Sequence, residues 1–230
     1  SLSFDDARAS CLDHGIPLLN THGVKATFYV LPHPVEEHLE SWRAAAEAGH
    51  EMGNHTASHP CSANFHWISP DRRTEDWTLP QMETDLDEAT VALQRLLDVT
   101  PRSFAYPCGN TTVGRGEQAH SYIPAIAKRF VCGRLFKSEG PVDPATADLS
   151  AVFGVDMDER DYADLVPYLD QARERSTWLV LAGHDMCLDK RQGVRRETLE
   201  ALCVLADGDA WVAPVADVAD HILAHRQVML

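Results

Sequence analysis

The sequence predicts an α/β fold in which about seven strand and helix units form a closed or nearly closed barrel. Short runs rich in β-branched and aromatic residues alternate with segments of helical periodicity, and several runs are apolar throughout, as in parallel sheets. Polar residues directly follow these runs, and the carboxyl ends of barrel strands converge on the face that carries active sites. We find no internal repeat and no linker, so residues 1–230 are expected to form one domain.

Strands are expected where β-branched and aromatic residues lie between turn formers. The first ends in two carboxylates, Asp5 and Asp6, and the run 26–31 is closed by prolines. The run 177–182 is apolar and long enough only for a buried strand. The expected strands are 1–6, 26–31, 51–54, 103–106, 130–132, 151–155, 177–182 and 210–212.

Helices are expected where apolar residues recur at steps of three and four. The clearest is 79–97, in which Met82, Leu86 and Leu93 follow this spacing with acidic residues between them. Gly49 is expected to cap the end of an earlier helix. The expected helices are 7–20, 36–48, 79–97, 117–128, 161–175, 197–206 and 215–225.

The segment 60–80 is too irregular for a helix or a strand and is predicted to be a long loop. It carries Phe65, Trp67 and Trp77 among Ser, Asp, Arg and Pro residues. Long ordered loops in compact domains are usually functional, so Trp67 is a candidate for stacking against a sugar ring or another flat ligand. The alternative, given equal weight, is that Trp67 and Trp77 attach the loop to the core.

Composition restricts the class of protein. The hydrophobic share of 44% and the charged share of 24% are those of an ordinary globular protein. No apolar run approaches the ~20 residues of a transmembrane helix. The formal charge of −15 would repel nucleic acids and anionic membranes, so neither is an expected partner, and a neutral or cationic substrate is favoured.

The six cysteines contain no Cys-x-x-Cys pair, which argues against a zinc ribbon. Most are expected to be buried or free thiols, a pattern typical of a reducing compartment, although their spacing is also compatible with disulfides. No signal peptide is visible. Because residues 1–4 read as the tail of a strand, upstream residues can be missing, and both a secreted or periplasmic and a cytoplasmic location stay open. The sequence gives no oligomeric state.

The stretch 51–60 contains two histidines four residues apart, His55 and His59. In a single helical turn they would lie on one face with Cβ atoms roughly 6 Å apart, close enough to bind one metal ion. Asp5 and Asp6 offer a third, anionic ligand, and three protein ligands leave one position for water. Alone, such a pair is more often solvated or capping. The convergence of polar residues at strand ends is what favours a metal site.

Four motifs resemble those of the polysaccharide deacetylase family, carbohydrate esterase family four. Residues 3–7, Ser-Phe-Asp-Asp-Ala, are similar to its Thr-Phe-Asp-Asp-Gly motif, and 55–59 match its His-[Ser/Thr]-x-x-His motif. Residues 104–109 are similar to its third motif and 179–184 to its last, in family order. The resemblance implies a distorted (β/α)7-type barrel that removes acetyl groups from N- or O-acetylated sugars with one divalent metal.

Applied to this sequence, the resemblance implies that Asp6, His55 and His59 bind the metal. It makes Asp5 the general base and His184 the acid that protonates the leaving group. Adjacent carboxylates at a strand end point to opposite sides, so one can bind metal while the other addresses water. Zinc is the expected ion, and cobalt, nickel and manganese are alternatives for two histidines and one aspartate.

The third motif implies that Tyr106 and Cys108 lie at the substrate. Oxyanion stabilisation needs a backbone N–H, which Pro107 lacks, so the N–H of Cys108 is the candidate. Two positions depart from the family pattern. Ala7 replaces the usual glycine, which is expected to be a mild change, and Ala105 stands where many members have an arginine that orients the base.

A family motif with an Asp-Trp pair has its nearest match at 155–158, so Asp156 is a candidate partner of His184. The expected activity is therefore metal-dependent deacetylation of an oligo- or polysaccharide by a catalytic domain spanning 1–230. Two alternatives stay open. The same fold could hydrolyse a non-sugar amide, or the chain could be a non-catalytic sugar-binding module, which the missing arginine would favour.

Overall fold

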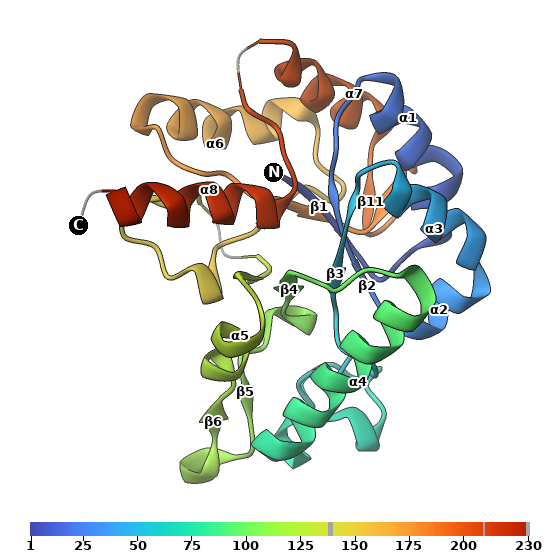
Figure 1. Cartoon of the computed structure of the whole chain (residues 1–230), viewed down its shortest axis with the longest axis vertical. Helices are drawn as coiled ribbons and strands as arrows, with labels where there is room; N and C mark the ends of the chain where they lie inside the picture. The colour runs from blue at the N-terminus through green and yellow to red at the C-terminus, as the bar shows by residue number, and fades with distance from the viewer. Residues whose placement is uncertain (138–139, 209, 229–230) are drawn as a thin grey trace.

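A sheet of seven parallel strands forms the centre of the molecule. The structure, a computed structural model, describes residues 1–137, 140–208 and 210–228. The strand order is β7-β4-β3-β2-β1-β9-β8, and the sheet curls into a half-barrel (Figure 1). This confirms the predicted α/β barrel of distorted type in a single domain. The strands are β1 Leu2–Asp5, β2 Thr27–Val30, β3 Glu51–Asn54, β4 Ser103–Ala105, β7 Cys132–Arg134, β8 Val155–Asp156 and β9 Leu181–Gly183.

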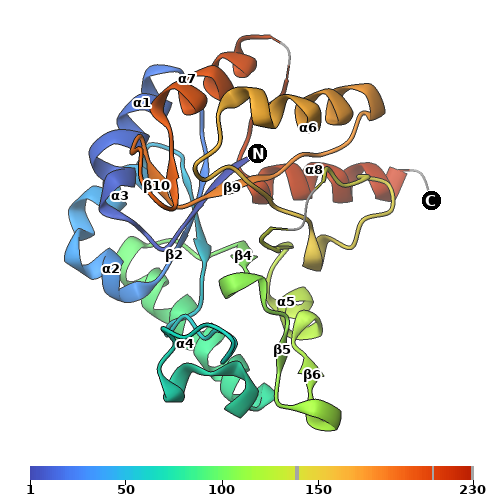
Figure 2. The ribbon, with the colours of Figure 1, turned by 180° about the vertical axis from the view of Figure 1, so that it is seen from behind.

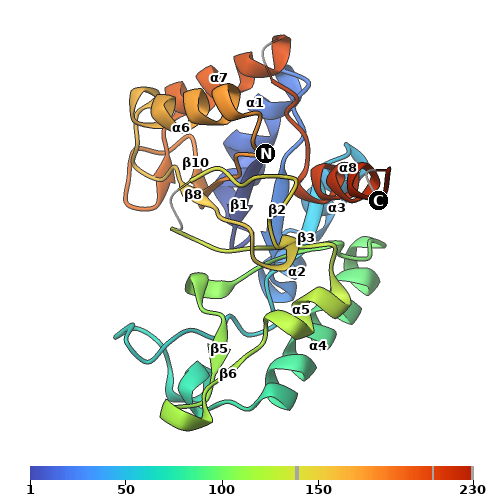
Figure 3. The ribbon, with the colours of Figure 1, turned by 90° about the vertical axis from the view of Figure 1, so that its left-hand side faces the viewer.

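The helices lie on the outside of the curled sheet (Figure 2). A quarter turn of the molecule shows α6 and α7 at one end and α4 and α5 at the other (Figure 3). Within the described residues, none of these helices combines the length and the apolarity that a bilayer crossing requires. They are α1 Ile16–Thr21, α2 Pro32–Glu37, α3 Leu39–Glu47, α4 Leu79–Leu97, α5 Ile123–Arg129, α6 Tyr162–Arg175, α7 Arg196–Val204 and α8 Val215–Val228.

Strand residues alternate between the helices and the barrel interior. On the helix side, Phe4 and Phe28 are paired in register and stack at 5.6 Å between ring centroids. In the next row Asp5, Tyr29 and Gly53 are paired across β1, β2 and β3 and face the interior. A Cβ atom at position 53 would lie 2.5 Å from the Tyr29 ring, so only glycine leaves room for this tyrosine. The row ends with Asp5 at the carboxyl end of β1.

The sequence predictions agree best with the structure at β3 and α4, which have the predicted bounds. Both are bounded by strong local signals, such as the capping box at the start of α4 and the left-handed Asp98 after its end. The single helix expected at 36–48 is wrong. Helical structure begins at Pro32 and is interrupted at His38, whose φ of −131° and ψ of 41° are not helical.

Two further expectations are wrong near the edges of the sheet. The helix expected at 117–128 begins only with α5, because a short antiparallel pair, β5 Thr112–Val113 and β6 His120–Ser121, comes before it. Residues 210–212, which the structure describes, form no strand, and the chain continues irregularly to α8. Strands of two residues, such as β5 and β6, are too short to produce an alternating pattern that could be detected in the sequence.

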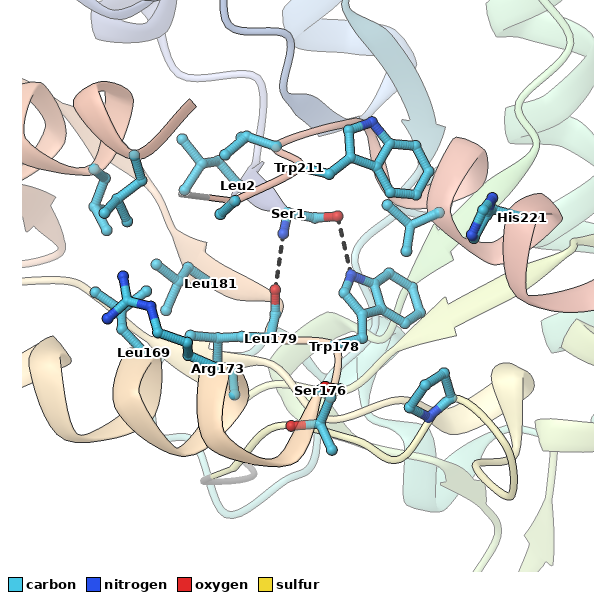
Figure 4. Close-up of a pocket in the computed structure, with 18 of the residues that line it drawn as sticks. Ser1, Leu2, Leu169, Arg173, Ser176, Trp178, Leu179, Leu181, Trp211 and His221 are labelled. Carbon is cyan, nitrogen blue, oxygen red and sulfur yellow. Dashed lines mark hydrogen bonds between the residues drawn. The ribbon is translucent and has the colours of Figure 1, made fainter. Parts of the chain in front are cut away.

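A largely apolar cavity of about 440 Å³ lies at the starts of β1 and β9 (Figure 4). On one wall Ser1 donates from its amino nitrogen to Leu179 O at 2.8 Å, and Trp178 Nε1 donates to Ser1 Oγ at 3.1 Å. Trp211 and His221 line another wall. Asp5 ends β1 and Asp6 follows it, so this cavity and the candidate site lie at opposite ends of the strands.

Candidate active site

The three predicted metal ligands converge at the carboxyl ends of β1 and β3. Asp6 directly follows β1, and His55 directly follows β3, with His59 four residues later. Asp6 Oδ1 lies 3.5 Å from His55 Nε2 and 3.3 Å from His59 Nε2. The three ligand atoms are all within 4.8 Å of one another, an arrangement that could hold a metal ion.

The loop after β3 brings the two imidazoles together without a helical turn. Thr56 and His59 have φ angles of 66° and 55°, in the left-handed region that non-glycine residues seldom adopt. Asn54 Oδ1 accepts the N–H of Thr56, and Asp85 of α4 accepts backbone N–H bonds from the same loop. The ring centroids of His55 and His59 are 4.9 Å apart. The two imidazoles are therefore close together, as their spacing predicts, but the predicted helical turn is wrong.

The chemistry of these donors fits a divalent metal. Burial opposes ionisation of Asp6, but its contacts with His55 and His59 hold the pKa of this carboxyl well below its usual range. Its other oxygen, Oδ2, accepts a hydrogen bond from Arg8 Nη2 at 2.7 Å. His55 Nδ1 lies 2.9 Å from Ala105 O, which leaves Nε2 as the nitrogen that could bind a metal ion. Two imidazoles and one carboxylate are a common ligand set for zinc.

His184, directly after β9, is held by Asp158 and not by the expected Asp156. His184 Nδ1 lies 2.6 Å from Asp158 Oδ2, and its backbone N–H donates to Asp158 Oδ1 at 3.0 Å. Asp156 instead accepts the N–H of Asp158 at 3.0 Å and lies 3.5 Å from Lys137 Nζ. The strand β8 ends at Asp156, and the chain then turns so that the second aspartate reaches β9.

The surroundings of His184 favour its charged form. Burial lowers the pKa of this imidazole, but the hydrogen bond to Asp158 and the charges of Asp5, Asp158 and Asp6 outweigh burial and raise it above its ordinary value. The edge of the Phe136 ring packs against it, with centroids 5.2 Å apart. An imidazole in this setting is suited to donate a proton.

Asp5 is buried at the end of β1 and is bonded to an arginine that the sequence did not reveal. Arg134 Nη2, from the edge strand β7, donates to Asp5 Oδ1. Arg134 is fully buried and stands in register opposite Ala105 on β4. The sequence gives little signal for this contact, because Arg134 lies two residues beyond the strand expected at 130–132.

Comparisons with known proteins agree with this constellation. The family model described as polysaccharide deacetylase matches residues 1–122, just over half of the 230-residue chain. The chain belongs to the polysaccharide deacetylase family. Its first two motifs and the third all lie within the matched residues, whereas His184 and Asp158 lie beyond them.

Among curated relatives of this member of the polysaccharide deacetylase family, similarity is confined to segments. Sixty residues are 40% identical to the chitooligosaccharide deacetylase of Rhizobium leguminosarum bv. trifolii, covering 26% of this chain and 28% of that protein. Another alignment is 28% identical over 99 residues to the uncharacterized protein YlxY of Bacillus subtilis (strain 168), covering 43% of this chain and 27% of that protein. The chain thus spans little more than a quarter of either relative.

Solved structures share the fold over nearly the whole chain. A Mycobacterium smegmatis protein assigned as a polysaccharide deacetylase has a TM-score of 0.67 at 19% identity, covering 98% of this chain and 90% of that chain. The peptidoglycan deacetylase PdaC of Bacillus subtilis gives 0.55 at 16%, covering 100% and 93%. A pseudoenzyme of carbohydrate esterase family four from Bacillus anthracis gives 0.53 at 19%, covering 95% and 64%. Because the family includes a pseudoenzyme, the fold alone does not establish turnover.

The third motif of this deacetylase family member differs from expectation at Tyr106. The ring is fully buried and its hydroxyl donates to Ser150 O at 2.7 Å. It packs against Phe104 and Tyr122 with centroids at 5.0 and 5.4 Å. The expectation that the Tyr106 side chain lies at the substrate is therefore wrong, because this position belongs to the core beside α5.

Cys108 lies at the site but is not a free thiol. It forms a disulfide with Cys61, and the remaining described cysteines, Cys11, Cys132, Cys187 and Cys203, are free. The disulfide ties the loop after β3 to the turn after β4, where Cys108 adopts φ 55° and ψ 15°. Cys61 Sγ also lies 3.6 Å from His59 Nδ1. The backbone that carries the expected oxyanion donor is thus fixed covalently beside a candidate metal ligand.

The two tryptophans of the 60–80 loop differ in their surroundings: Trp77 is partly buried, whereas Trp67 is exposed. Trp77 is partly buried and packs against the core cluster that contains Met82 and Leu86, so it attaches the loop to the core. Trp67 is 50% exposed and lies 6.3 Å from the His59 ring and 5.5 Å from the Phe65 ring. An exposed aromatic pair therefore borders the candidate metal ligands.

Proposed function

We propose that this polysaccharide deacetylase removes acetyl groups from an N- or O-acetylated oligo- or polysaccharide in a metal-dependent reaction, and that residues 1–230 form its catalytic domain. The observation that supports this most directly is the convergence of Asp6, His55 and His59 on one point of the strand ends. Near this ligand set, Asp5 would serve as the base, and His184, held by Asp158, would serve as the acid.

Asp6, His55 and His59 would hold the ion, for which zinc is our first candidate and cobalt, nickel and manganese are alternatives. When bound, a divalent ion would polarise the acetyl carbonyl and lower the pKa of the attacking water towards ~7. The ionised state of Asp6 and the hydrogen bond that fixes the His55 ring both support such binding.

The protein groups around the ion have complementary tasks. Asp5 is buried and fixed, and it would accept the proton of the attacking water as general base. His184, whose pKa is raised despite its burial, would donate a proton to the leaving nitrogen or oxygen of the sugar. The backbone N–H of Cys108 would stabilise the negative oxygen of the tetrahedral intermediate.

Three observations favour a carbohydrate as substrate. Trp67 and Phe65, 50% and 39% exposed, offer flat apolar surface beside the ligands, which suits the face of a sugar ring. The chain carries a formal charge of −15, so the amine released by N-deacetylation would be attracted to the protein. The Rhizobium relative is a chitooligosaccharide deacetylase by name.

The test is acetate release from a panel of N- and O-acetylated oligosaccharides and of small non-sugar amides. It uses chelated protein with and without added zinc or cobalt. Activity on sugars that returns only with metal supports the proposal. Release from the amides alone would assign the chain to a different amide hydrolase. Sugar binding without acetate release, with metal demonstrably bound, would indicate a non-catalytic binding module.

Variants separate the roles within the site. Asp5→Asn is expected to abolish turnover while one equivalent of metal stays bound, because Asp5 is assigned to the proton and not to the ion. Asp6→Ala and His55→Ala are expected to lose the metal. Equal metal loss in all three variants would show that the roles are assigned wrongly.

A further inference from the structure

The buried contact between Asp5 and Arg134 crosses the barrel interior. Asp5 lies on β1 and Arg134 on β7, and the strands β2, β3 and β4 separate these two in the sheet. Arg134 Nη2 nevertheless donates to Asp5 Oδ1, because both side chains point inward from the curled sheet. Arg134 has no exposed surface and Asp5 is 3% exposed, so water does not screen this ion pair.

The guanidinium group of Arg134 is held from several sides. Its Nη1 donates to Leu135 O at 3.2 Å, and its central carbon lies 5.0 Å from the Tyr29 ring centroid and 5.7 Å from that of Phe136. Its Nε has no hydrogen-bond partner among the described residues. A planar guanidinium between aromatic rings has little freedom, and Asp5 is the carboxylate bonded to it.

The neighbouring positions leave room for this side chain. A Cβ atom at Gly154 would lie 2.7 Å from Arg134 Cδ and 2.4 Å from Leu135 O, so even alanine would displace the arginine or its strand. On the other side, position 105 faces Arg134 in register across β4 and β7 and is occupied by a small alanine. The interior therefore has space for one arginine in this row, supplied by β7.

We propose that Arg134 is a positioning residue that holds the Asp5 carboxylate in the orientation needed for its role as base, a role that position 105 cannot supply in this chain. The inference rests on the proposed deacetylase function. Arg134 occupies one oxygen of Asp5 and leaves the other for the reacting water. It has no contact with Asp6, His55 or His59 among the described hydrogen bonds and ion pairs, so its effect on metal binding should be small.

The first variant is Arg134→Met, which keeps a long apolar stem and removes the charge. We expect kcat to fall by at least about 100-fold, the range of a general base that is no longer positioned. KM and the bound metal per protein should stay within about twofold, because neither the aromatic pair nor the metal ligands are touched. Arg134→Lys, which keeps a charge but loses the planar fork, should recover only part of kcat.

The second variant moves the arginine back across the two strands. The double variant Ala105→Arg with Arg134→Met places a guanidinium in the same interior row, one strand away. We expect its kcat to be at least tenfold higher than that of Arg134→Met. In a separate experiment, methylguanidine added to Arg134→Ala should restore activity in a saturable way. A residue needed only for folding would show neither recovery.

The outcomes are distinguishable when wild-type protein is assayed in parallel on the same acetylated oligosaccharides. A wild-type protein that loads metal but releases no acetate overturns the proposed function and this inference with it. An active wild type with an Arg134→Met variant of equal kcat overturns only the inference. The inference is also overturned if the variants lose metal together with activity. It is overturned as well if Arg134→Lys, the double variant and methylguanidine all fail to restore activity, because Arg134 is then a structural residue.

Discussion

Asp158 accepts two hydrogen bonds from His184, one from the imidazole Nδ1 and one from the backbone N–H. The first fixes the orientation and the tautomer of the ring, and the second fixes the strand end that carries it. His184 can therefore present Nε2 to a substrate in one orientation. The proposed role of His184 as proton donor therefore depends on this partner, which lies 26 residues earlier in the chain.

We expect Asp158→Asn to lower kcat on the order of 100-fold in the acetate-release assay. Asparagine keeps an acceptor for the backbone N–H but carries no charge to favour the imidazolium form of His184. The matched control is Asp156→Asn, which changes the neighbouring carboxylate that does not contact the ring and should leave kcat within a few-fold. Equal losses in the two variants would contradict the assignment of Asp158.

The Cys61–Cys108 disulfide is expected to stabilise the fold and the metal site together. Its two cysteines are 47 residues apart, and closing a loop of this length contributes about 4 kcal/mol in the chain-entropy account. A variant with both cysteines changed to serine should lose a large part of this in denaturant unfolding and bind zinc less tightly. Cys187→Ser, at a free cysteine, is the control. Unchanged stability and zinc affinity in the double variant would refute the expectation.

His50 is expected to make the protein sensitive to mild acid. Burial, with a smaller effect of Lys25, lowers the pKa of this imidazole from 6.5 to about 4, and its nitrogens are engaged by Ala26 N–H and Asn20 Oδ1. The folded state thus prefers neutral His50. This stability is fully present above pH 6.5 and is lost as the pH falls towards 4, by about 3 kcal/mol in total.

The measurement is the free energy of unfolding in urea at pH 7 and at pH 4.5. In His50→Gln, which cannot ionise, the difference between the two pH values should be smaller than in the wild type by most of that amount. Should both proteins lose equal stability between these pH values, other groups are responsible for the acid sensitivity.

Trp67→Ala is expected to raise KM for an acetylated oligosaccharide by about 2- to 10-fold with little change in kcat, because stacking of this size contributes about 0.5–1.5 kcal/mol. Trp211→Ala is the matched control. Trp211 is equally exposed, at 58% against 50%, but borders the cavity at the opposite end of the strands. A similar rise in KM for both variants would show that the effect is not local to the site.

The sequence predicted those parts of the molecule that local signals determine. β3 and α4 have strong periodicity and clear turn or capping residues, and Asp6, His55 and His59 follow strand ends that any parallel barrel brings together. The role of Asp158 was assigned to Asp156, two residues away, because the turn after β8 decides which carboxylate reaches His184.

The contact of Asp5 with Arg134 joins residues 129 positions apart. No periodicity or spacing reports such a pair, because it depends on how far the sheet curls and which side chain fills the interior. The missing arginine at position 105 was read as a possible sign of a non-catalytic protein. The structure instead supplies an arginine from the adjacent strand, at the position in register with Ala105.

The ion pair between Arg8 and Asp6 bears on which ions this centre can select. Arg8 Nη2 and Nε lie 2.7 and 3.2 Å from Asp6 Oδ2, so this carboxylate has only Oδ1 directed at His55 and His59. Calcium takes about six to eight oxygens, often with both oxygens of a carboxylate, whereas zinc accepts single oxygens and imidazole nitrogens in a small shell. If a metal ion binds here, the contact with Arg8 would leave Asp6 to ligate through one oxygen, which suits zinc better than calcium.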